Sequence, residues 1–146
     1  AAVSIGDPTA TGEILGPVLF EEYAVRYLNR VIEGIRAAGA PVIVHICGDL
    51  KAVRHLLPRI KSDAISTDAL VNLRLLKQEF PALTTMGNVS TYLLEFGPAE
   101  KVAAVAKKLV RDGVDIISPA CGLSTSTSLA TIRAMTAAVK GGGADG

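Results

Sequence analysis

The sequence predicts an α/β fold built from parallel β/α units that form the C-terminal part of a TIM (β/α)₈ barrel. Three observations support this prediction: short apolar runs alternate with amphipathic segments, each run ends in polar residues, and five such units fill the 146 residues. Strands that alternate with helices pair in parallel through right-handed crossovers. A complete barrel needs about 250 residues, so the chain accounts for part of one. The alternative at this point is an open doubly wound sheet.

Five apolar runs predict the strands. The first run stops at Asp7-Pro8, and in the second the consecutive apolar residues Val42, Ile43 and Val44 are typical of a parallel strand covered on both faces. In chain order the predicted strands are VSIGDP (3–8), PVIVHICG (41–48), DAISTD (63–68), LTTMGNVS (83–90) and DIISPACG (115–122).

The segments between these runs carry apolar residues at helical spacing. The first segment ends at Gly39 as a C-cap, the second is interrupted or ended near Pro58, and the third stops before Pro81. The fourth ends at Asp112-Gly113. In chain order the predicted helices cover residues 17–38, 51–60, 69–80, 98–111 and 127–140.

The two ends of the sequence favour a part of a larger barrel. The sequence lacks an initiator Met, opens directly on a strand and closes on KGGGADG, which contains no core-forming residue. We therefore expect residues 1–140 to be the C-terminal part of a larger barrel and residues 141–146 to be a flexible tail.

Composition narrows the class of protein. Apolar residues make up 49% and charged residues 20% of the chain, which is ordinary for a globular α/β domain. The net charge of +1 and the 4% of aromatic residues give no reason to expect a nucleic-acid or membrane partner. The apolar runs are far shorter than a membrane span, and no signal peptide is recognised. We expect a cytoplasmic protein whose two cysteines are reduced.

Polar residues gather where the predicted strands end. In parallel α/β folds ligands bind beyond the carboxyl ends of the strands, so these residues are expected around one mouth. Taken singly, residues such as Asp7, Asp68 and Ser118 are equally explained as helix caps or turn formers. In chain order the strand-end residues are Asp7, His45, Cys47, Thr67, Asp68, Asn88, Ser90, Ser118 and Cys121.

His45 and Cys47 stand two positions apart, so a continuing strand would point both to the same face. Together with Cys121 they would supply three zinc ligands and leave one position open, as in catalytic zinc sites. In a flat sheet the second and fifth strands would lie about 14 Å apart, too far to share one ion. The metal hypothesis therefore favours a curved or closed sheet. The simpler alternative is a buried structural cysteine and a chance His-x-Cys pair.

Four motifs resemble the uroporphyrinogen decarboxylase superfamily, and within it the corrinoid-dependent methylcobalamin:coenzyme M methyltransferases. The resemblance covers nearly the whole chain but only the C-terminal part of such an enzyme. Decarboxylases proper lack the His-x-Cys pair with a distant Cys in a PxCG context, and their substrate-binding arginines come mainly from a region absent here. In chain order the motifs are DPTATGEILGP (7–17), HICG (45–48), MGNVST (86–91) and SPACGLSTSTSLATIRAMTAAV (118–139).

The resemblance implies roles for individual residues. His45, Cys47 and Cys121 match the zinc ligands of the zinc-dependent methyltransferases, and Asp68 lies where such enzymes supply a carboxylate to the zinc before the thiol arrives. Four further residues are expected to bind substrate at the mouth, with turn stabilisation as the alternative: Asp7, Gly48, Asn88 and Ser90.

The resemblance also implies a reaction. We expect a zinc-dependent transfer of a methyl group from methylcobalamin or a related corrinoid to a thiol such as coenzyme M, with a corrinoid protein and a small thiol as partners. The chain alone is expected to be inactive and to self-associate through exposed barrel edges. Two alternatives remain: a decarboxylase-like enzyme without metal, and a non-catalytic binding or assembly module.

Overall fold

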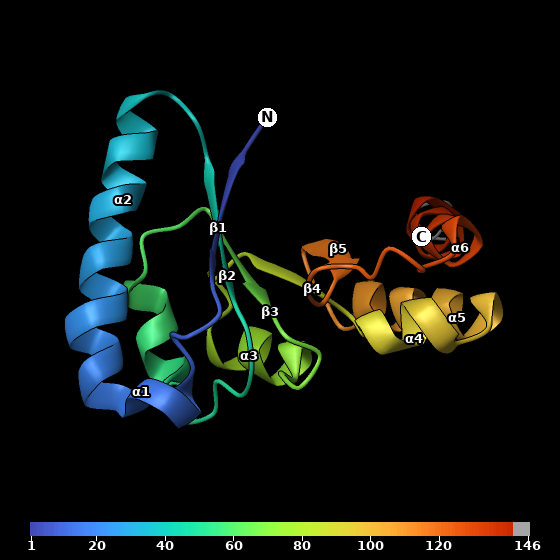
Figure 1. Cartoon of the computed structure of the whole chain (residues 1–146), viewed down its shortest axis with the longest axis horizontal. Coiled ribbons are helices and arrows are strands. Elements are labelled where there is room, and N and C mark those ends of the chain that lie inside the picture. Colours follow the sequence, from blue (N-terminus) through green and yellow to red (C-terminus); the bar gives the residue numbers. More distant parts are fainter. Residues whose placement is uncertain (142–146) are drawn as a thin grey trace.

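The sheet of this protein is parallel throughout, and its strand order follows the chain. The computed structural model describes residues 1–141, and the strands pair in the order β1-β2-β3-β4-β5 (Figure 1). An open doubly wound sheet reverses its order at a switch point, whereas a barrel wall keeps chain order. The predicted barrel segment is therefore confirmed. The strands are β1 (Val3–Asp7), β2 (Val42–Ile46), β3 (Ala64–Thr67), β4 (Thr85–Val89) and β5 (Ile116–Pro119).

Helical segments connect the strands, as predicted from the apolar spacing. The first connection contains a π-helical segment, and the second is a short 3₁₀-helix in place of the predicted α-helix. The segments are α1 (Gly12–Leu19), η1 (Phe20–Val25), α2 (Arg26–Ala37), η2 (Arg54–Arg59), α3 (Leu73–Glu79), α4 (Thr91–Phe96), α5 (Ala99–Arg111) and α6 (Leu129–Gly141).

The first helical connection begins earlier than the predicted residue 17. Thr11 is its N-cap, and the Thr11 side chain accepts a hydrogen bond of 3.2 Å from the backbone N–H of Ile14. Gly16, with φ of 62°, then breaks the helical geometry before Pro17 starts the next turn. Pro17 is favourable in a first helical turn, which is why the sequence pattern pointed to it as the start.

Three other helices differ from the prediction. Helix α3 begins at Leu73, because Asn72 caps it by accepting a hydrogen bond of 3.2 Å from the N–H of Leu75. Helix α4 was not predicted, since its six residues are too few to display a helical period. Helix α6 includes Gly141, and residues 142–146 of the predicted tail lie outside the described residues.

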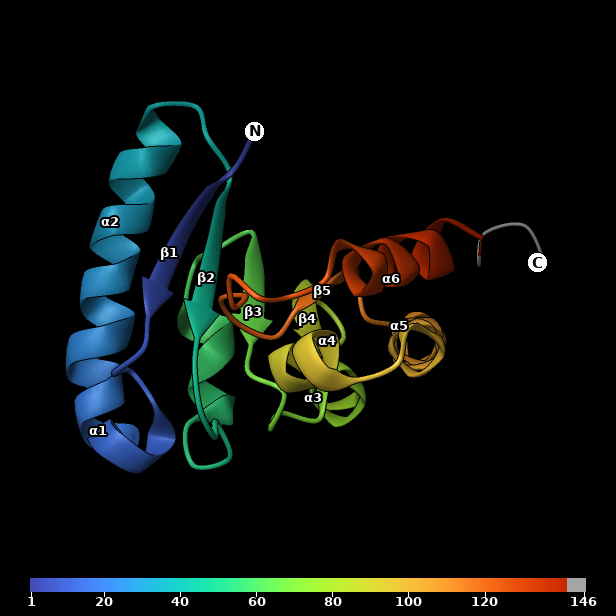
Figure 2. The ribbon, with the colours of Figure 1, turned by 45° about the vertical axis from the view of Figure 1, so that its right-hand side comes forward.

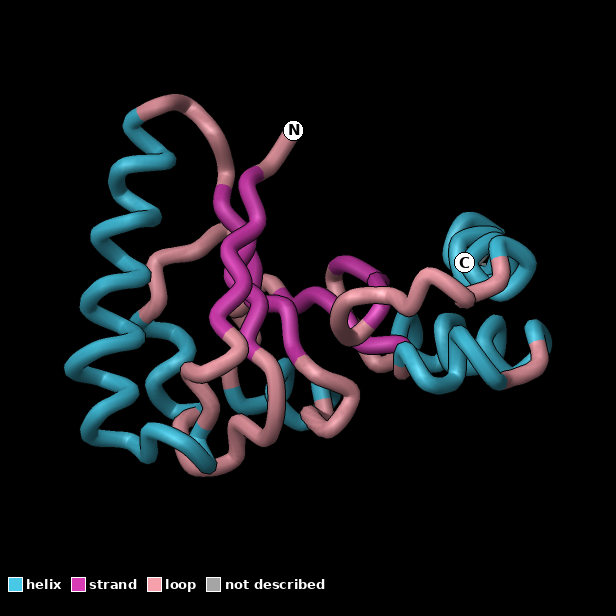
Figure 3. Tube along the Cα trace, viewed as in Figure 1, coloured by secondary structure: helices cyan, strands magenta, loops and turns pink. Residues whose placement is uncertain are grey.

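Helices cover the outer face of the sheet. Along β2, Val42, Val44 and Ile46 are fully buried, whereas the alternate residues Ile43 and His45 are partly exposed. Figure 2 shows α1 and α2 beside β1 and β2, with α4, α5 and α6 beside β4 and β5. Figure 3 shows the strands running through the middle of the molecule between these two groups of helices. The partly exposed residues of β2 therefore belong to the inner face of the barrel wall.

Two aspartates tie the amino ends of the strands together. Just before β3, Asp63 accepts hydrogen bonds of 2.7 Å from the N–H of Val42 and from Arg36. Just before β5, Asp115 accepts one of 2.8 Å from the N–H of Thr85 and pairs with Lys77. These contacts fix the amino-end edge of the sheet, and they leave the carboxyl ends of the strands for a site.

No helix within residues 1–141 has both the length and the apolar character needed to cross a membrane.

Candidate metal centre

Strand β2 places His45 on the inner face of the sheet, and Cys47 follows just beyond the end of the strand. His45 pairs in register with Gly6 of β1 and Ser66 of β3, so its ring lies over the middle of a three-strand segment. Gly48 then turns the chain away with a φ of 75°, a backbone conformation that residues with a side chain rarely adopt. A Cβ at Gly48 would also lie 3.1 Å from Cγ2 of Thr11. Gly48 therefore has a structural reason to be glycine, and its predicted contact with substrate remains a prediction.

Three potential ligand atoms meet at this point. Nε2 of His45 lies 3.2 Å from Sγ of Cys47, and Sγ of Cys47 lies 3.7 Å from Sγ of Cys121. All three atoms lie within 4.8 Å of one another. A flat sheet would separate β2 and β5 by about 14 Å, so the curvature of the sheet is what brings Cys121 to the other two.

Two of the three spacings are close to those of a tetrahedral zinc site, and the third, between Nε2 of His45 and Sγ of Cys121, is within 4.8 Å. With Zn–S bonds of about 2.3 Å and Zn–N bonds of about 2.0–2.1 Å, two ligating sulfurs lie about 3.8 Å apart and a sulfur and a nitrogen about 3.6 Å apart. The 3.7 Å between the two sulfurs matches, and the 3.2 Å between Nε2 and Sγ needs a shift of a few tenths of an ångström. Three such ligands leave one vertex of the tetrahedron open.

The electrostatic surroundings favour a neutral His45 ring and a protonated Cys47 thiol in the metal-free protein. Burial lowers the pKa of His45, and the charge of Asp68 opposes this only in part. Burial raises the pKa of the Cys47 thiol to about 11, with further contributions from the neighbouring Cys121 and from Asp68. A neutral imidazole offers the lone pair that a metal needs, whereas the thiol must release its proton to solvent when it binds a metal ion.

Asp68 lies beside the three ligands without belonging to the group. Its Oδ2 accepts a hydrogen bond of 3.4 Å from the N–H of Gly48, and its Oδ1 accepts one of 3.1 Å from the N–H of Leu70. The first contact joins the loop after β3 to the residue that follows Cys47. The carboxylate is thus held next to the candidate centre by the backbone of two neighbouring loops.

The polar atoms of the other predicted mouth residues hold turns and loops. Nδ2 of Asn88 donates hydrogen bonds of 2.8 Å to the carbonyls of Asp68 and Val71. Ser90 caps α4. Asp7 accepts three bonds of 3.0–3.2 Å from Thr9 and Ala10. These contacts are the turn-stabilising alternative considered from the sequence, and the substrate-binding role of the three residues remains a prediction.

Ser66 is a site residue that the sequence did not indicate. Its hydroxyl oxygen lies 3.0 Å from Nδ1 of His45, on the side of the ring opposite Cys47. The contact depends on the register in which His45 and Ser66 stand side by side across β2 and β3. Strand register between separate β/α units is not encoded in any local motif, so no sequence signal points to this pair.

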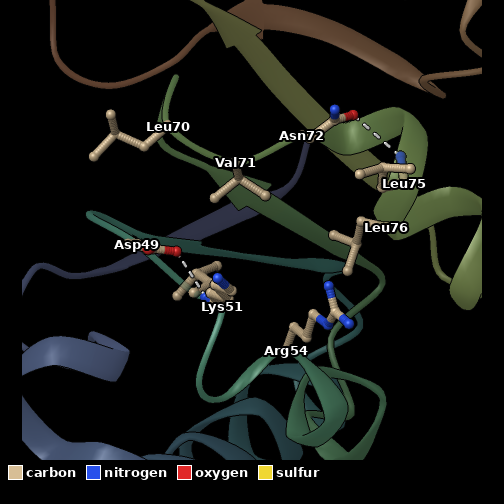
Figure 4. Close-up of a pocket in the computed structure, with 9 residues that line it drawn as sticks. Asp49, Lys51, Arg54, Leu70, Val71, Asn72, Leu75 and Leu76 are labelled. Carbon is tan, nitrogen blue, oxygen red and sulfur yellow. Dashed lines mark hydrogen bonds between the residues drawn. The ribbon is translucent and has the colours of Figure 1, made fainter.

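Several cavities lie around the mouth of the barrel segment. A cavity of about 290 Å³ separates the loop after β2 from the loop after β3, and Figure 4 shows Asp49 and Lys51 across it from Leu70 and Val71. Asn88 and Ser90 line a second cavity of about 400 Å³. Asp7 lines a third cavity, beside α2. The predicted mouth residues therefore border separate hollows on this part of the barrel.

Comparison with known proteins identifies the family. The family model described as "Uroporphyrinogen decarboxylase (URO-D)" matches residues 1–142, and the chain belongs to this family. It is 27% identical over 139 residues to the methylcobamide:CoM methyltransferase MtbA of Methanosarcina acetivorans, covering 94% of this chain and 41% of that protein. It is 29% identical over 91 residues to the uroporphyrinogen decarboxylase of Anaeromyxobacter dehalogenans, covering 62% of this chain and 26% of that protein.

A solved structure supports the fold. A methyltransferase from Methanosarcina mazei superposes with a TM-score of 0.87 at 24% identity, covering 96% of this chain and 42% of that chain. The chain thus spans about two fifths of the length of the methyltransferases that it matches. The resemblance noted from the four sequence motifs is confirmed at the level of the family.

Proposed function

We propose that this chain carries the metal-binding part of a cytoplasmic enzyme that transfers a methyl group from a methylated corrinoid to a small thiol. The observation that carries the proposal is the convergence of His45, Cys47 and Cys121, whose potential ligand atoms all lie within 4.8 Å of one another. The relatives named methylcobamide:CoM methyltransferases support the reaction class.

Each ligand would contribute a distinct property to the metal. His45 offers the lone pair of Nε2 from a ring kept neutral by burial. Cys47 and Cys121 would bind as thiolates, and soft sulfur ligands favour zinc over magnesium or calcium. When bound, zinc would act as a Lewis acid that lowers the pKa of a substrate thiol toward neutral pH. The two cysteine sulfurs donate charge, which preserves the nucleophilicity of that substrate sulfur.

The reaction balances without an additional oxidant or reductant. The substrate thiol loses its proton to solvent, and its sulfur attacks the methyl carbon of the corrinoid. The sulfur–carbon bond forms as the cobalt–carbon bond breaks, and the electron pair of the broken bond stays on cobalt. The role of this chain is to hold the sulfur in line with the methyl group, since positioning supplies much of the rate of such displacements.

Asp68 is the proposed occupant of the open position in the absence of substrate. The loops around it already hold its carboxylate beside the ligand group. A carboxylate ligand that a thiol displaces would keep the metal four-coordinate until substrate arrives. The bonds from Gly48 and Leu70 to the two carboxylate oxygens would break or lengthen when Asp68 turns toward the metal.

The remaining surfaces of the enzyme lie beyond this chain. We propose that it is inactive alone, because the corrinoid-facing part of the mouth needs further β/α units. Strands β1 and β5 are the outer strands of the sheet formed by residues 1–141. Unpaired strand edges favour association, so self-association is the proposed behaviour of the isolated chain.

Two alternative functions differ from the proposal in what they predict about metal binding: a decarboxylase-like enzyme without metal, and a non-catalytic binding or assembly module. A decarboxylase-like enzyme has no use for the His-x-Cys pair and the distant Cys. A binding or assembly module would bind no zinc, or would leave no open position for an exogenous thiol.

The first experiment is elemental analysis of the chain purified without chelator, beside the variant Cys47→Ser. We expect about one zinc per chain in the parent protein and its loss in the variant. A cobalt-substituted sample then tests the open position: coenzyme M should change the thiolate-to-cobalt absorption band, and 2-hydroxyethanesulfonate, which lacks the thiol, should not. Zinc at equal occupancy in Cys47→Ser, or no uptake by either protein, would overturn the proposal.

A further inference from the structure

We propose that Ser66 is a positioning residue that orients the ring of His45 for metal binding. The inference rests on the proposed role of His45 as a metal ligand. It assigns to Ser66 the hydrogen bond to the ring nitrogen that does not bind the metal, a contact that commonly sets ligand affinity in metal sites.

The two residues are fixed to each other by the sheet. His45 and Ser66 are direct neighbours in the parallel ladder between β2 and β3. The hydroxyl oxygen of Ser66 lies 3.0 Å from Nδ1 of His45, and Nε2 lies 3.2 Å from Sγ of Cys47. Ser66 is 5% exposed, so solvent does not readily replace its hydroxyl. Nδ1 of the ring therefore contacts the Ser66 hydroxyl, and Nε2 faces the cysteine sulfurs.

This contact selects one of two ring orientations. Rotating the imidazole by half a turn about its Cβ–Cγ bond would place carbon atoms where Nδ1 and Nε2 now lie. Only the observed orientation gives Ser66 a hydrogen bond, and only that orientation presents Nε2 to the sulfur atoms. Loss of the hydroxyl would let both orientations compete, at a cost to metal affinity.

A hydroxyl is also suited to the change that metal binding demands. A metal on Nε2 requires the proton of the neutral ring to sit on Nδ1, which then donates to Oγ of Ser66. Before the metal binds, the same hydroxyl can donate to an unprotonated Nδ1. Ser66 thus holds the ring in place in both states, which a backbone carbonyl could not do.

The test compares zinc affinity by chelator competition in the parent chain and three variants. We expect Ser66→Ala to weaken zinc binding by about 10- to 100-fold. We expect Ser66→Thr, which keeps the hydroxyl, to restore most of the affinity. Thr67→Val is the matched control, because Thr67 is the next residue of β3, is fully buried, and has a hydroxyl with no hydrogen-bond partner among residues 1–141. Its zinc affinity should stay unchanged.

A second measurement separates ring orientation from general destabilisation. In ¹⁵N NMR of the zinc-loaded parent chain, His45 should show a Nδ1–H protected from exchange with water. The exposed His55 provides the reference ring in the same sample. The protection should disappear in Ser66→Ala while the melting temperature of the metal-free chain stays close to that of the parent.

The outcomes distinguish this inference from the proposed function. Tight zinc binding by the parent chain with equal affinity in Ser66→Ala would overturn the role of Ser66 and leave the metal site standing. Metal on Nδ1, or no protected Nδ1–H in the zinc-loaded parent, would do the same. Absence of zinc uptake by the parent chain would instead overturn the proposed function, and the inference with it.

Discussion

The sulfur atoms of Cys47 and Cys121 lie 3.7 Å apart although 74 residues separate them in the chain. They follow β2 and β5, between which β3 and β4 intervene in the sheet. The approach of the two sulfurs is therefore a direct product of sheet curvature. A metal bound between them would hold the ends of β2 and β5 together, so metal binding and folding are expected to be coupled.

The first prediction follows from this coupling: zinc should stabilise the chain. At free zinc 100 times above its dissociation constant, mass action adds about 2.7 kcal/mol. For a domain of this size that corresponds to a rise in melting temperature of roughly 5–10 °C. The measurement is thermal unfolding with zinc and with chelator. Cys121→Ser should lose the difference, and an undiminished zinc effect in that variant would remove Cys121 from the site.

The second prediction concerns Asp68. Asp68→Asn should leave zinc bound, since three ligands remain, but it should change the affinity for an added thiol because the displaceable carboxylate is gone. The measurement is thiol titration of the cobalt-substituted chain, with zinc content determined in parallel. Asp49→Asn is the control, since Asp49 lies on the neighbouring loop and its Oδ1 accepts a hydrogen bond from the backbone N–H of Lys51. Loss of zinc in Asp68→Asn would show a structural rather than a displaceable carboxylate.

The third prediction concerns Asn88, whose side chain is largely buried and ties down the loop that carries Asp68. Asn88→Ala should destabilise the chain by about 1–3 kcal/mol, because two backbone carbonyls lose their donor. Urea unfolding measures this cost. Hydrogen exchange at the amides of Leu70 and Val71 should also accelerate. In Ser90→Ala, which removes only the cap of α4, those two amides should exchange as in the parent. Equal acceleration in both variants would contradict the role of Asn88 in holding the loop.

Much of the fold follows from local patterns in the sequence. The apolar run Val42-Ile43-Val44 predicts a covered strand, and His45 and Cys47 at its end predict a site on one face. Helix starts were harder to place. Thr11 and Pro17 are both start signals for the first helical segment, and in the structure the segment begins at the Thr11 cap. Helix α4 was not predicted because its six residues are too few to show a helical period.

The residues that complete the site depend on geometry between units. Cys121 could be placed beside Cys47 only by assuming a curved sheet, which a linear sequence does not specify. Ser66 was missed because its partner is set by the register of β2 against β3. The same limit applies to Asn88, whose amide bridges to the loop after β3. Local chemistry is visible in the sequence, whereas cross-strand contacts are not.

The last prediction concerns the amino-end edge of the sheet. Burial raises the pKa of Asp115, but the hydrogen bonds from Lys77 and Thr85 outweigh it and hold the pKa below the usual 3.8. Asp115→Asn should therefore destabilise the chain at neutral pH by about 1–2 kcal/mol, a value kept low because the ion pair is partly exposed.

The lowered pKa of Asp115 determines how its contribution to stability changes with pH. A carboxyl whose pKa is lower in the folded state contributes its full stability above its unfolded pKa and loses it as the pH falls through the folded value. The difference in unfolding free energy between the parent chain and Asp115→Asn should thus be constant above about pH 5 and shrink below it. Urea unfolding across this range measures it. Glu33→Gln, in the exposed pair with Lys61, is the control and should change stability little. A difference that grows on acidification would mean that Asp115 is protonated more readily in the folded chain, and that its contacts oppose rather than support the sheet.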